Sequence, residues 1–222
     1  MSNDSETKPE FENASDDFEQ GKLIIVCGPS GAGKSTLVHT VMGRIPRLRF
    51  SISHTTRAAR LGEQPGVDYY FVSEAEFIAL RERGEFLECA NVHQHLYGTS
   101  LGEIERGRAA GVDMLLDIDV QGAEQVRRKV ADAVTIMVLP PSRAVLEERL
   151  RLRNLNRPDD LSRRLQDAVL EVRRTKDFEY VILNEDLERA ADALEAIILA
   201  QRHRVERRGK LLKKIIDTFG GE

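Results

Sequence analysis

An eight-residue run near the amino terminus combines glycines with a lysine and a hydroxyl group at a fixed spacing. The run is Gly28-Pro29-Ser30-Gly31-Ala32-Gly33-Lys34-Ser35, which matches the pattern G-x-x-x-x-G-K-[ST]. In such a loop the glycines let backbone N–H groups converge on phosphate oxygens, the lysine supplies a mobile cation, and the final hydroxyl ligates Mg²⁺. The pattern therefore predicts a site for a nucleoside triphosphate with Mg²⁺, in which Ser35 is the metal-ligating residue.

The segments on either side of this run are those that a phosphate-binding loop needs. Residues 23–27 are wholly apolar and predict a buried strand, while residues 36–44 repeat their apolar side chains with a helical period. A helix that begins at the loop adds the partial positive charge of its first turn to the site. This context disfavours the alternative interpretation, which is a flexible Gly/Ser turn.

Apolar runs and helical segments alternate along most of the chain, which predicts an α/β fold with a parallel sheet flanked by helices. The expected strands are 23–27, 48–53, 69–72, 85–92, 114–119, 134–139 and 180–184. The expected helices are 36–44, 100–110, 120–129, 161–176 and a long final one from 187. Ser73 and Glu76 form a capping box for one more helix, which Gly84 ends. A turn-rich insert at about 53–100 and a polar break at 154–160 interrupt this alternation.

Length and composition indicate one main domain. The 222 residues are 41% hydrophobic, which is enough for one sizeable core without disulfides or a structural metal. Cys27 and Cys89 form neither a disulfide framework nor a metal-binding spacing, as is typical of a reducing cytosol. The sequence shows no apolar run of membrane-spanning length and no signal-peptide pattern. We expect a cytoplasmic protein with no membrane or nucleic-acid partner, and the oligomeric state stays open.

Charge is distributed unevenly along the chain. Residues 1–20 contain seven acidic residues and one lysine, a net charge of −6, so the −4 of the whole chain leaves +2 for residues 21–222. Such an acidic segment cannot bury enough apolar surface to order itself, so residues 1–20 are predicted to be a disordered leader that catalysis does not need. At the other end, residues 206–222 are predicted to be the basic end of the final helix.

Two further groups of charged residues bear on function. Asp117 and Asp119 end an apolar run two residues apart, so a strand would place both carboxylates on the same side, near the phosphates. The alternative is a structural ion pair with a neighbouring arginine.

Five arginines gather at the two interruptions of the α/β alternation: Arg57, Arg60, Arg149, Arg153 and Arg164. A solvated charged face explains this clustering poorly, whereas recognition of phosphate explains it well.

Several runs, in the same order along the chain, resemble the guanylate kinases, which move the γ-phosphoryl group of ATP onto GMP. Besides 28–36, the matching runs are Ser51-Ile52-Ser53-His54-Thr55-Thr56-Arg57, Arg60, Gly62-Glu63, Asp68-Tyr69, Tyr97-Gly98-Thr99, Leu116-Asp117-Ile118-Asp119, Gln121-Gly122 and Asn184. The resemblance covers about 21–205. It implies a P-loop kinase fold with a small inserted GMP-binding subdomain at about 53–100 and an arginine-rich lid at about 149–164. It also implies ATP and Mg²⁺ as cofactors and GMP, with dGMP, as the acceptor in purine nucleotide metabolism and GMP recycling.

The resemblance also implies roles for individual residues. Guanine presents an acceptor at O6 and donors at N1 and the 2-amino group, so its pocket needs hydroxyls and a carboxylate. The family's GMP positions fall on Ser53, Arg57, Arg60, Tyr69, Glu88, Tyr97, Thr99, Asp117 and Asp119. The ATP positions are Gly28, Pro29, Ser30, Gly31, Ala32, Gly33, Lys34, Ser35, Thr36, Arg149, Arg153 and Asn184. The implied catalytic residues are Lys34, Arg57, Arg149 and Arg164.

The chain departs from the family pattern in three places. The lid has Leu152-Arg153-Asn154 where Gly-Arg-Gly is usual, Cys89 stands where tryptophan is frequent, and His93-Gln94-His95 is unusual ahead of the pocket tyrosine. His93 and His95 would share one face of a strand. Two histidines without a third ligand do not predict a metal site, and we assign none.

Two other functions fit parts of the pattern. A noncatalytic guanylate-kinase-like scaffold module would bind phosphorylated partner segments through the GMP site, but the complete P-loop with Lys34 argues against it. A related kinase acting on a ribose phosphate would have no use for a guanine-reading set made of Ser53, Glu88 and Asp119.

Overall fold

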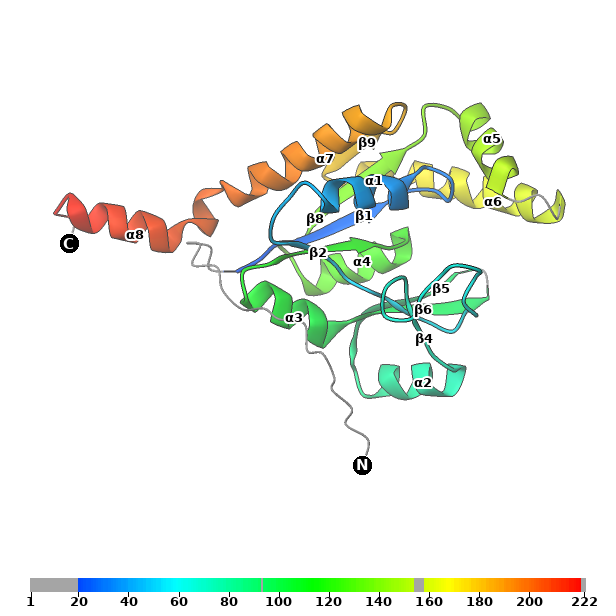
Figure 1. The fold of residues 1–222 in the computed structure, drawn as a ribbon, viewed down its shortest axis with the longest axis horizontal. Helices are drawn as coiled ribbons and strands as arrows, with labels where there is room; N and C mark the ends of the chain where they lie inside the picture. The colour runs from blue at the N-terminus through cyan, green and yellow to red at the C-terminus, as the bar shows by residue number, and fades with distance from the viewer. Residues whose placement is uncertain (1–19, 93, 154–157, 221–222) are drawn as a thin grey trace.

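A five-stranded parallel sheet forms the centre of the molecule (Figure 1). The computed structural model describes residues 20–92, 94–153 and 158–220. The strand order is β2-β7-β1-β8-β9, and the strands are β1 Leu23–Cys27, β2 Leu48–Phe50, β7 Asp113–Asp117, β8 Val134–Leu139 and β9 Tyr180–Leu183. This sheet confirms the predicted fold class.

Helices cover both faces of the sheet because the buried strands are apolar on both sides. Along β1, Ile24 and Val26 face a core shared with α1 (Lys34–Met42) and α7 (Leu187–Arg202). Leu23, Ile25 and Cys27 face a second core shared with α3 (Leu101–Ala109) and α4 (Val120–Lys129). Beyond the sheet, α5 (Arg143–Arg153) packs against α6 (Pro158–Arg173) through a smaller apolar cluster.

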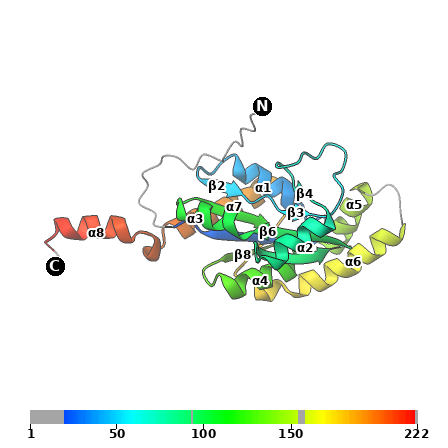
Figure 2. The same ribbon diagram turned by 90° about the horizontal axis from the view of Figure 1, so that it is seen from below.

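A second, smaller sheet lies beside the main one, in the order β4-β3-β6-β5. Its strands are β3 His54–Thr55, β4 Tyr70–Phe71, β5 Phe86–Val92 and β6 His95–Ser100. The helix α2 (Glu74–Glu82) begins with the predicted capping box and buries Phe77, whose ring stacks on Phe86 with centroids 4.6 Å apart. Gly98 is needed on β6 because a Cβ there would lie 3.0 Å from both rings. Figure 2 shows this sheet and α2 from below.

Several expected boundaries are wrong. The strand expected at 48–53 ends at Phe50, where its pairing with β7 stops at Leu115. The strand expected to end at Asp119 ends at Asp117, because Asp119 is the N-cap of α4, so strand alternation is not what relates these two carboxylates. The helix expected at 161–176 ends at Arg173, and the 3₁₀ turn η1 (Thr175–Asp177) follows.

The final helix is also not continuous. It divides into α7, the 3₁₀ turn η2 (Val205–Arg207) and α8 (Gly209–Thr218). The break has a physical cause, since Arg202 and Arg207 turn back to the same buried carboxylate instead of lying on a solvated basic face. Among the described residues, the helices are too short or too polar to cross a membrane.

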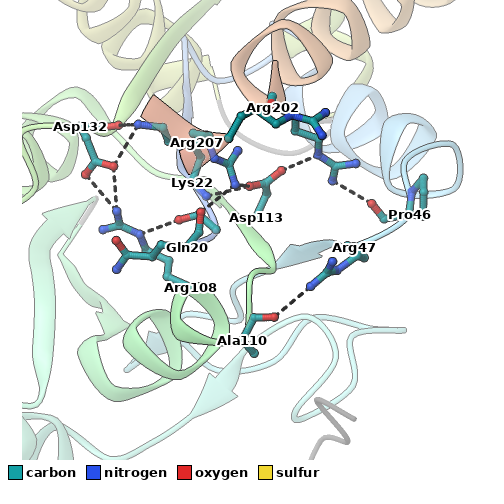
Figure 3. A network of polar contacts seen from close by, with 12 residues as sticks. Gln20, Lys22, Pro46, Arg47, Arg108, Ala110, Asp113, Asp132, Arg202 and Arg207 are labelled. Atoms are coloured by element: carbon teal, nitrogen blue, oxygen red, sulfur yellow. Dashed lines mark hydrogen bonds and ion pairs between the residues drawn. The ribbon is translucent and has the colours of Figure 1, made fainter. Parts of the chain in front are cut away.

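That carboxylate belongs to Asp113, which begins β7 and is 2% exposed (Figure 3). One oxygen, Oδ1, accepts from the backbone N–H of Lys22 at 2.7 Å and from Arg207 at 3.1 Å. The other, Oδ2, accepts from Nε of Arg202 at 2.7 Å, and the same guanidinium donates to the carbonyl of Pro46. The amino ends of β1 and β7 are therefore fastened to the end of α7 by one buried negative charge.

We expect Asp113→Asn to be strongly destabilising, because it leaves two buried guanidinium groups beside a neutral amide. The expected loss is about 3–5 kcal/mol in the free energy of unfolding, measured by urea denaturation. Asp132→Asn is the matched control, since Asp132 also pairs with a lysine and an arginine but its side chain is 47% exposed. That change should cost less than about 1 kcal/mol. Equal losses in the two variants would contradict this role for Asp113.

Candidate active site

A cleft of about 1030 Å³ opens between the carboxyl end of the main sheet and the smaller sheet. Its walls bring together residues from segments far apart in the sequence. Among them are Gly28, Ser30, Lys34, Ser35, Thr36, Ser53, Arg57, Arg60, Glu63, Tyr69, Glu88, Tyr97, Asp117, Asp119 and Glu171. The carboxyl edge of a parallel sheet is the usual place for a ligand in such folds.

The glycine-rich loop joins β1 to α1 at one end of this cleft. Gly28 has φ +147° and a Cβ there would lie 2.1 Å from the carbonyl of Val138, so the loop requires glycine at this position. Gly33 is the N-cap of α1 in the left-handed region, at φ 88°. The first turn of α1 carries no acidic residue, so the partial positive charge of its N–H groups is available to an anion.

The two polar residues that end the loop both reach Asp117. Nζ of Lys34 donates to the carbonyl of Gly28 at 2.6 Å and lies 3.8 Å from Oδ1 of Asp117. Oγ of Ser35 donates to Oδ2 of the same carboxylate at 3.5 Å. Burial raises the pKa of Asp117, while Lys34 acts in the opposite direction. Asp117 therefore lies with the loop residues, and its cationic neighbour is a lysine instead of the arginine of the alternative interpretation.

Two of the residues assigned to ATP, Arg149 and Asn184, contact the backbone of the loop and are not among the cleft-lining residues. Nδ2 of Asn184 donates to the carbonyl of Ala32 at 2.8 Å, and the guanidinium of Arg149 donates to that carbonyl and to the carbonyl of Asn184. Asn184 is 5% exposed, and a Cβ on Gly33 would lie 2.4 Å from its amide nitrogen. These contacts fix the shape of the loop.

The remaining lid residues are placed less completely. Arg164 is half-buried on α6 and is not among the residues that line the cleft. Arg153 ends α5, but its side chain lies outside the described residues, as do Asn154 of the altered lid turn and His93.

At the other end of the cleft lies a buried carboxylate on β5. Glu88 is 3% exposed, and its Oε1 accepts from Oγ1 of Thr99 at 2.6 Å. Burial raises the pKa of Glu88 to about 7, partly opposed by the hydrogen bond from Thr99. Across from it, Oδ1 of Asp119 accepts from the N–H of Gly122 at 2.8 Å. Gly122 must lack a side chain, because a Cβ there would lie 2.6 Å from Oε2 of Glu88.

Between these two ends lies a cationic and aromatic group. The Arg57 guanidinium donates to the hydroxyl of Tyr97 at 3.2 Å and to Oε1 of Glu63 at 2.9 Å, and it lies 5.3 Å from the ring centroid of Tyr69. The exposed Arg60 lines the same wall, and its backbone N–H donates to Oε2 of Glu63 at 2.8 Å. Donors on planar guanidinium and phenol groups suit the oxygens of a phosphate.

Three acidic residues that line the cleft were not among the predicted site residues: Glu63, Asp68 and Glu171. Glu63 holds both Arg57 and the backbone of Arg60, and its hydrogen bond from Arg57 lowers its own pKa. The matching Gly62-Glu63 run was the signal that could have identified it. Glu171, on α6, lines the cleft, and burial raises its pKa to about 7. Its segment is dense in charged residues, so the sequence carries no signal that singles it out.

A comparison with protein families matches residues 20–201 to guanylate kinase. The chain belongs to the guanylate kinase family. A guanylate kinase of Aromatoleum aromaticum is 50% identical over 184 residues, which cover 83% of this chain and 90% of that protein. The guanylate kinase of Haemophilus ducreyi is 47% identical over 184 residues, covering 82% and 89%. A crystal structure of the guanylate kinase from Anaplasma phagocytophilum superposes with a TM-score of 0.73 at 32% identity, covering 86% of this chain and 90% of that one.

For this guanylate kinase we expect Glu88→Gln to lower kcat/KM for GMP by about 10- to 150-fold. The substitution keeps the size of the side chain but replaces a charge-assisted acceptor with an amide, a loss of roughly 1.5–3 kcal/mol. AMP presents an unprotonated N1 at the same edge, so its kcat/KM should already be low in the wild type and should fall much less on substitution. The measurement is kcat/KM for both nucleotides, with the melting temperature as the control for folding. An unchanged GMP:AMP ratio would remove Glu88 from the pocket.

The raised pKa of Glu88 also predicts a pH dependence. With a pKa of about 7, this carboxyl becomes increasingly protonated as the pH falls below 7. On the expectation that Glu88 accepts from both guanine donors, protonation removes part of that acceptor, so GMP affinity should fall by up to about tenfold per pH unit. The phosphate of GMP itself titrates near pH 6, so the useful quantity is the ratio of wild-type to Glu88→Gln affinity, measured calorimetrically from pH 6 to 8. A ratio that is constant over this range would contradict the prediction.

Proposed function

We propose that this guanylate kinase transfers the γ-phosphoryl group of ATP, bound with Mg²⁺ at the glycine-rich loop, to the phosphate of GMP or dGMP. The products are ADP and GDP or dGDP, which places the reaction in purine nucleotide metabolism and GMP recycling. The observation that carries the proposal is that one cleft joins a phosphate-binding loop to a pocket with a buried carboxylate and hydroxyl. A cytoplasmic location of the protein stays a prediction.

The donor set at the loop fits Mg²⁺. The hydroxyl of Ser35 and the carboxylate of Asp117 are hard oxygen ligands, and their mutual contact places them on the same side of the loop. Ser35 would hold the ion that accompanies ATP, with Asp117 supporting it from the end of β7. When bound, Mg²⁺ supplies positive charge to the triphosphate oxygens.

At the GMP end of the cleft, different residues are assigned to the guanine base and to the phosphate. We assign Glu88 and Asp119 to the N1 and 2-amino donors of guanine, and the hydroxyls of Ser53 and Thr99 to the remaining polar edge and to positioning Glu88. We assign the phosphate to the side chains of Arg57, Arg60, Tyr69 and Tyr97. Glu63 then acts as a positioning residue, because it orients Arg57 before the nucleotide arrives.

The reaction requires little help with proton transfer, but it requires strong stabilisation of negative charge. The phosphate of GMP has its second pKa near 6, so at neutral pH it is largely a ready nucleophile and needs no dedicated general base. The enzyme must instead align two anions that repel one another and neutralise the migrating group. We assign that task to Lys34, Arg57, Arg149 and Arg164. Closure of the region around α5 and α6 over ATP would also exclude water and limit hydrolysis.

A coupled assay of ADP formation tests the proposal directly. The proposal requires ADP production that depends on both ATP and GMP, with GDP accumulating in equal amount. A scaffold module that only binds phosphorylated ligands would bind GMP without forming GDP. That result would overturn the proposed reaction.

We expect Lys34→Ala to lower kcat on the order of 100-fold or more, because it removes a preorganised cation from the transferred phosphoryl group. GMP affinity should change far less, since Lys34 lies at the loop end of the cleft, beside Gly28 and Asp117. The measurements are steady-state kinetics and calorimetric GMP binding on protein whose melting temperature matches wild type. Turnover close to that of wild type would refute the role of Lys34.

A further inference from the structure

The helix α8 has an apolar stripe that no described part of the chain covers. Within Gly209–Thr218 each residue is exposed or half-exposed, and Figures 1 and 2 both show α8 projecting away from the body of the molecule. With 3.6 residues per turn, one stripe of its surface collects the apolar side chains Leu211, Leu212, Ile215, Ile216 and, just past the end, Phe219. Ile215, Ile216 and Phe219 are 45%, 53% and 85% exposed.

The rest of the surface of α8 is cationic. Lys210, Lys213 and Lys214 lie off the apolar stripe, with Asp217 as the one acidic residue of the helix. A contiguous apolar stripe bordered by charge is typical of an interaction surface. Its partner should combine apolar side chains with negative charge.

The chain brings such a segment to the base of α8. Arg207, in the turn just before α8, donates to the carbonyl of Gln20 at 2.7 Å while its guanidinium also donates to Asp113 at 3.1 Å (Figure 3). The next residue, Gly21, is fixed in turn, because its backbone N–H donates to the carbonyl of Arg108 at 2.8 Å. Gln20, at which the described chain begins, and the turn before α8 are therefore held by the same buried polar network.

Length and composition both suit the leader for this surface. Its nineteen residues before Gln20 can span at most roughly 60 Å, whereas the ten residues of α8 extend over about 15 Å. The leader carries a net charge of −6 and contains two phenylalanines, Phe11 and Phe18, each between acidic residues or next to them. Phe18 is separated by one residue only from Gln20, whose carbonyl is bound by Arg207 just before α8.

We propose that residues 1–19 bind α8 of the same chain. Phe11 and Phe18 cover the apolar stripe, and the acidic residues face the three lysines. Because the leader is tethered at Gln20, its effective concentration at α8 is on the order of millimolar, which favours the same chain over a second copy at ordinary protein concentrations. The contact lies at the amino ends of the strands, opposite the cleft, so the leader still need not contribute to catalysis.

A single tryptophan reports this contact, because the chain has none of its own. Phe219→Trp should emit at shorter wavelength and be less accessible to acrylamide in the full chain than in a chain lacking residues 2–19. The double substitution Phe11→Ser and Phe18→Ser, which keeps every charge, should have the same effect as the deletion. Leu61→Trp is the control reporter, since Leu61 is fully exposed next to the cleft-lining Arg60 and should be insensitive to the leader. Identical emission of Phe219→Trp in full and shortened chains would overturn the proposal.

The other possible occupants give different outcomes. If α8 binds a second copy instead, the emission shift will depend on protein concentration and survive removal of the leader, which would overturn the proposal. With vesicles of phosphatidylglycerol and phosphatidylcholine, the shortened chain should bind more tightly than the full chain, because the leader competes for α8. Equal vesicle binding by the two chains would show that the leader leaves α8 uncovered.

Discussion

The pairing of β1 with β7 is the constraint on which the rest of the structure depends. Its register sets Val26 opposite Asp117. The last residue of β7 therefore brings its carboxylate beside the loop that follows β1. The same register sets the first residue of β7, Asp113, beside Lys22 at the opposite edge of the sheet. One short strand therefore carries a buried aspartate at its start and a half-buried one at its end, about 13 Å apart. The first fastens the fold to its carboxyl-terminal segment, and the second supports the site.

The pocket for the base depends on a second junction, between α4 and the smaller sheet. Gln125 of α4 pairs with both backbone groups of Cys89, accepting from its N–H at 3.2 Å and donating to its carbonyl at 2.8 Å. Lys129 adds a bond to the carbonyl of Leu87. These bonds hold β5 against the helix that Asp119 caps, so Glu88 and Asp119 face one cleft although Glu88 lies on a strand of the smaller sheet and Asp119 begins a helix of the main layer. Because Gly122 has no side chain, the carboxylate of Glu88 can lie close to the first turn of α4.

The sequence was most informative where function depends on local geometry. The loop at 28–35 and the strand and helix around it could be predicted because their residues are consecutive, and the capping box at Ser73 is equally local. The parallel sheet followed from alternating apolar and helical segments. The grouping of Glu88 with Thr99 and Asp119 came from the resemblance to a family, because no local pattern relates residues on separate elements. What could not be predicted depends on distant partners: Asp119 as a helix cap, Glu63 as the ion-pair partner of Arg57, and the return of Arg207 to Asp113 that divides the final helix.

We propose that one cleft binds guanine at one end and transfers a phosphoryl group at the other. The most direct test of this proposal is product formation by the unmodified enzyme with ATP, Mg²⁺ and, in turn, GMP, dGMP, AMP, CMP and UMP, with all nucleotides separated and quantified. We expect ADP and GDP in equal amounts with GMP, comparable use of dGMP, and kcat/KM lower by at least about 100-fold for AMP, CMP and UMP, which would leave the buried carboxylate unpaired. Comparable turnover of AMP, or ADP formed without GDP, would contradict the proposal.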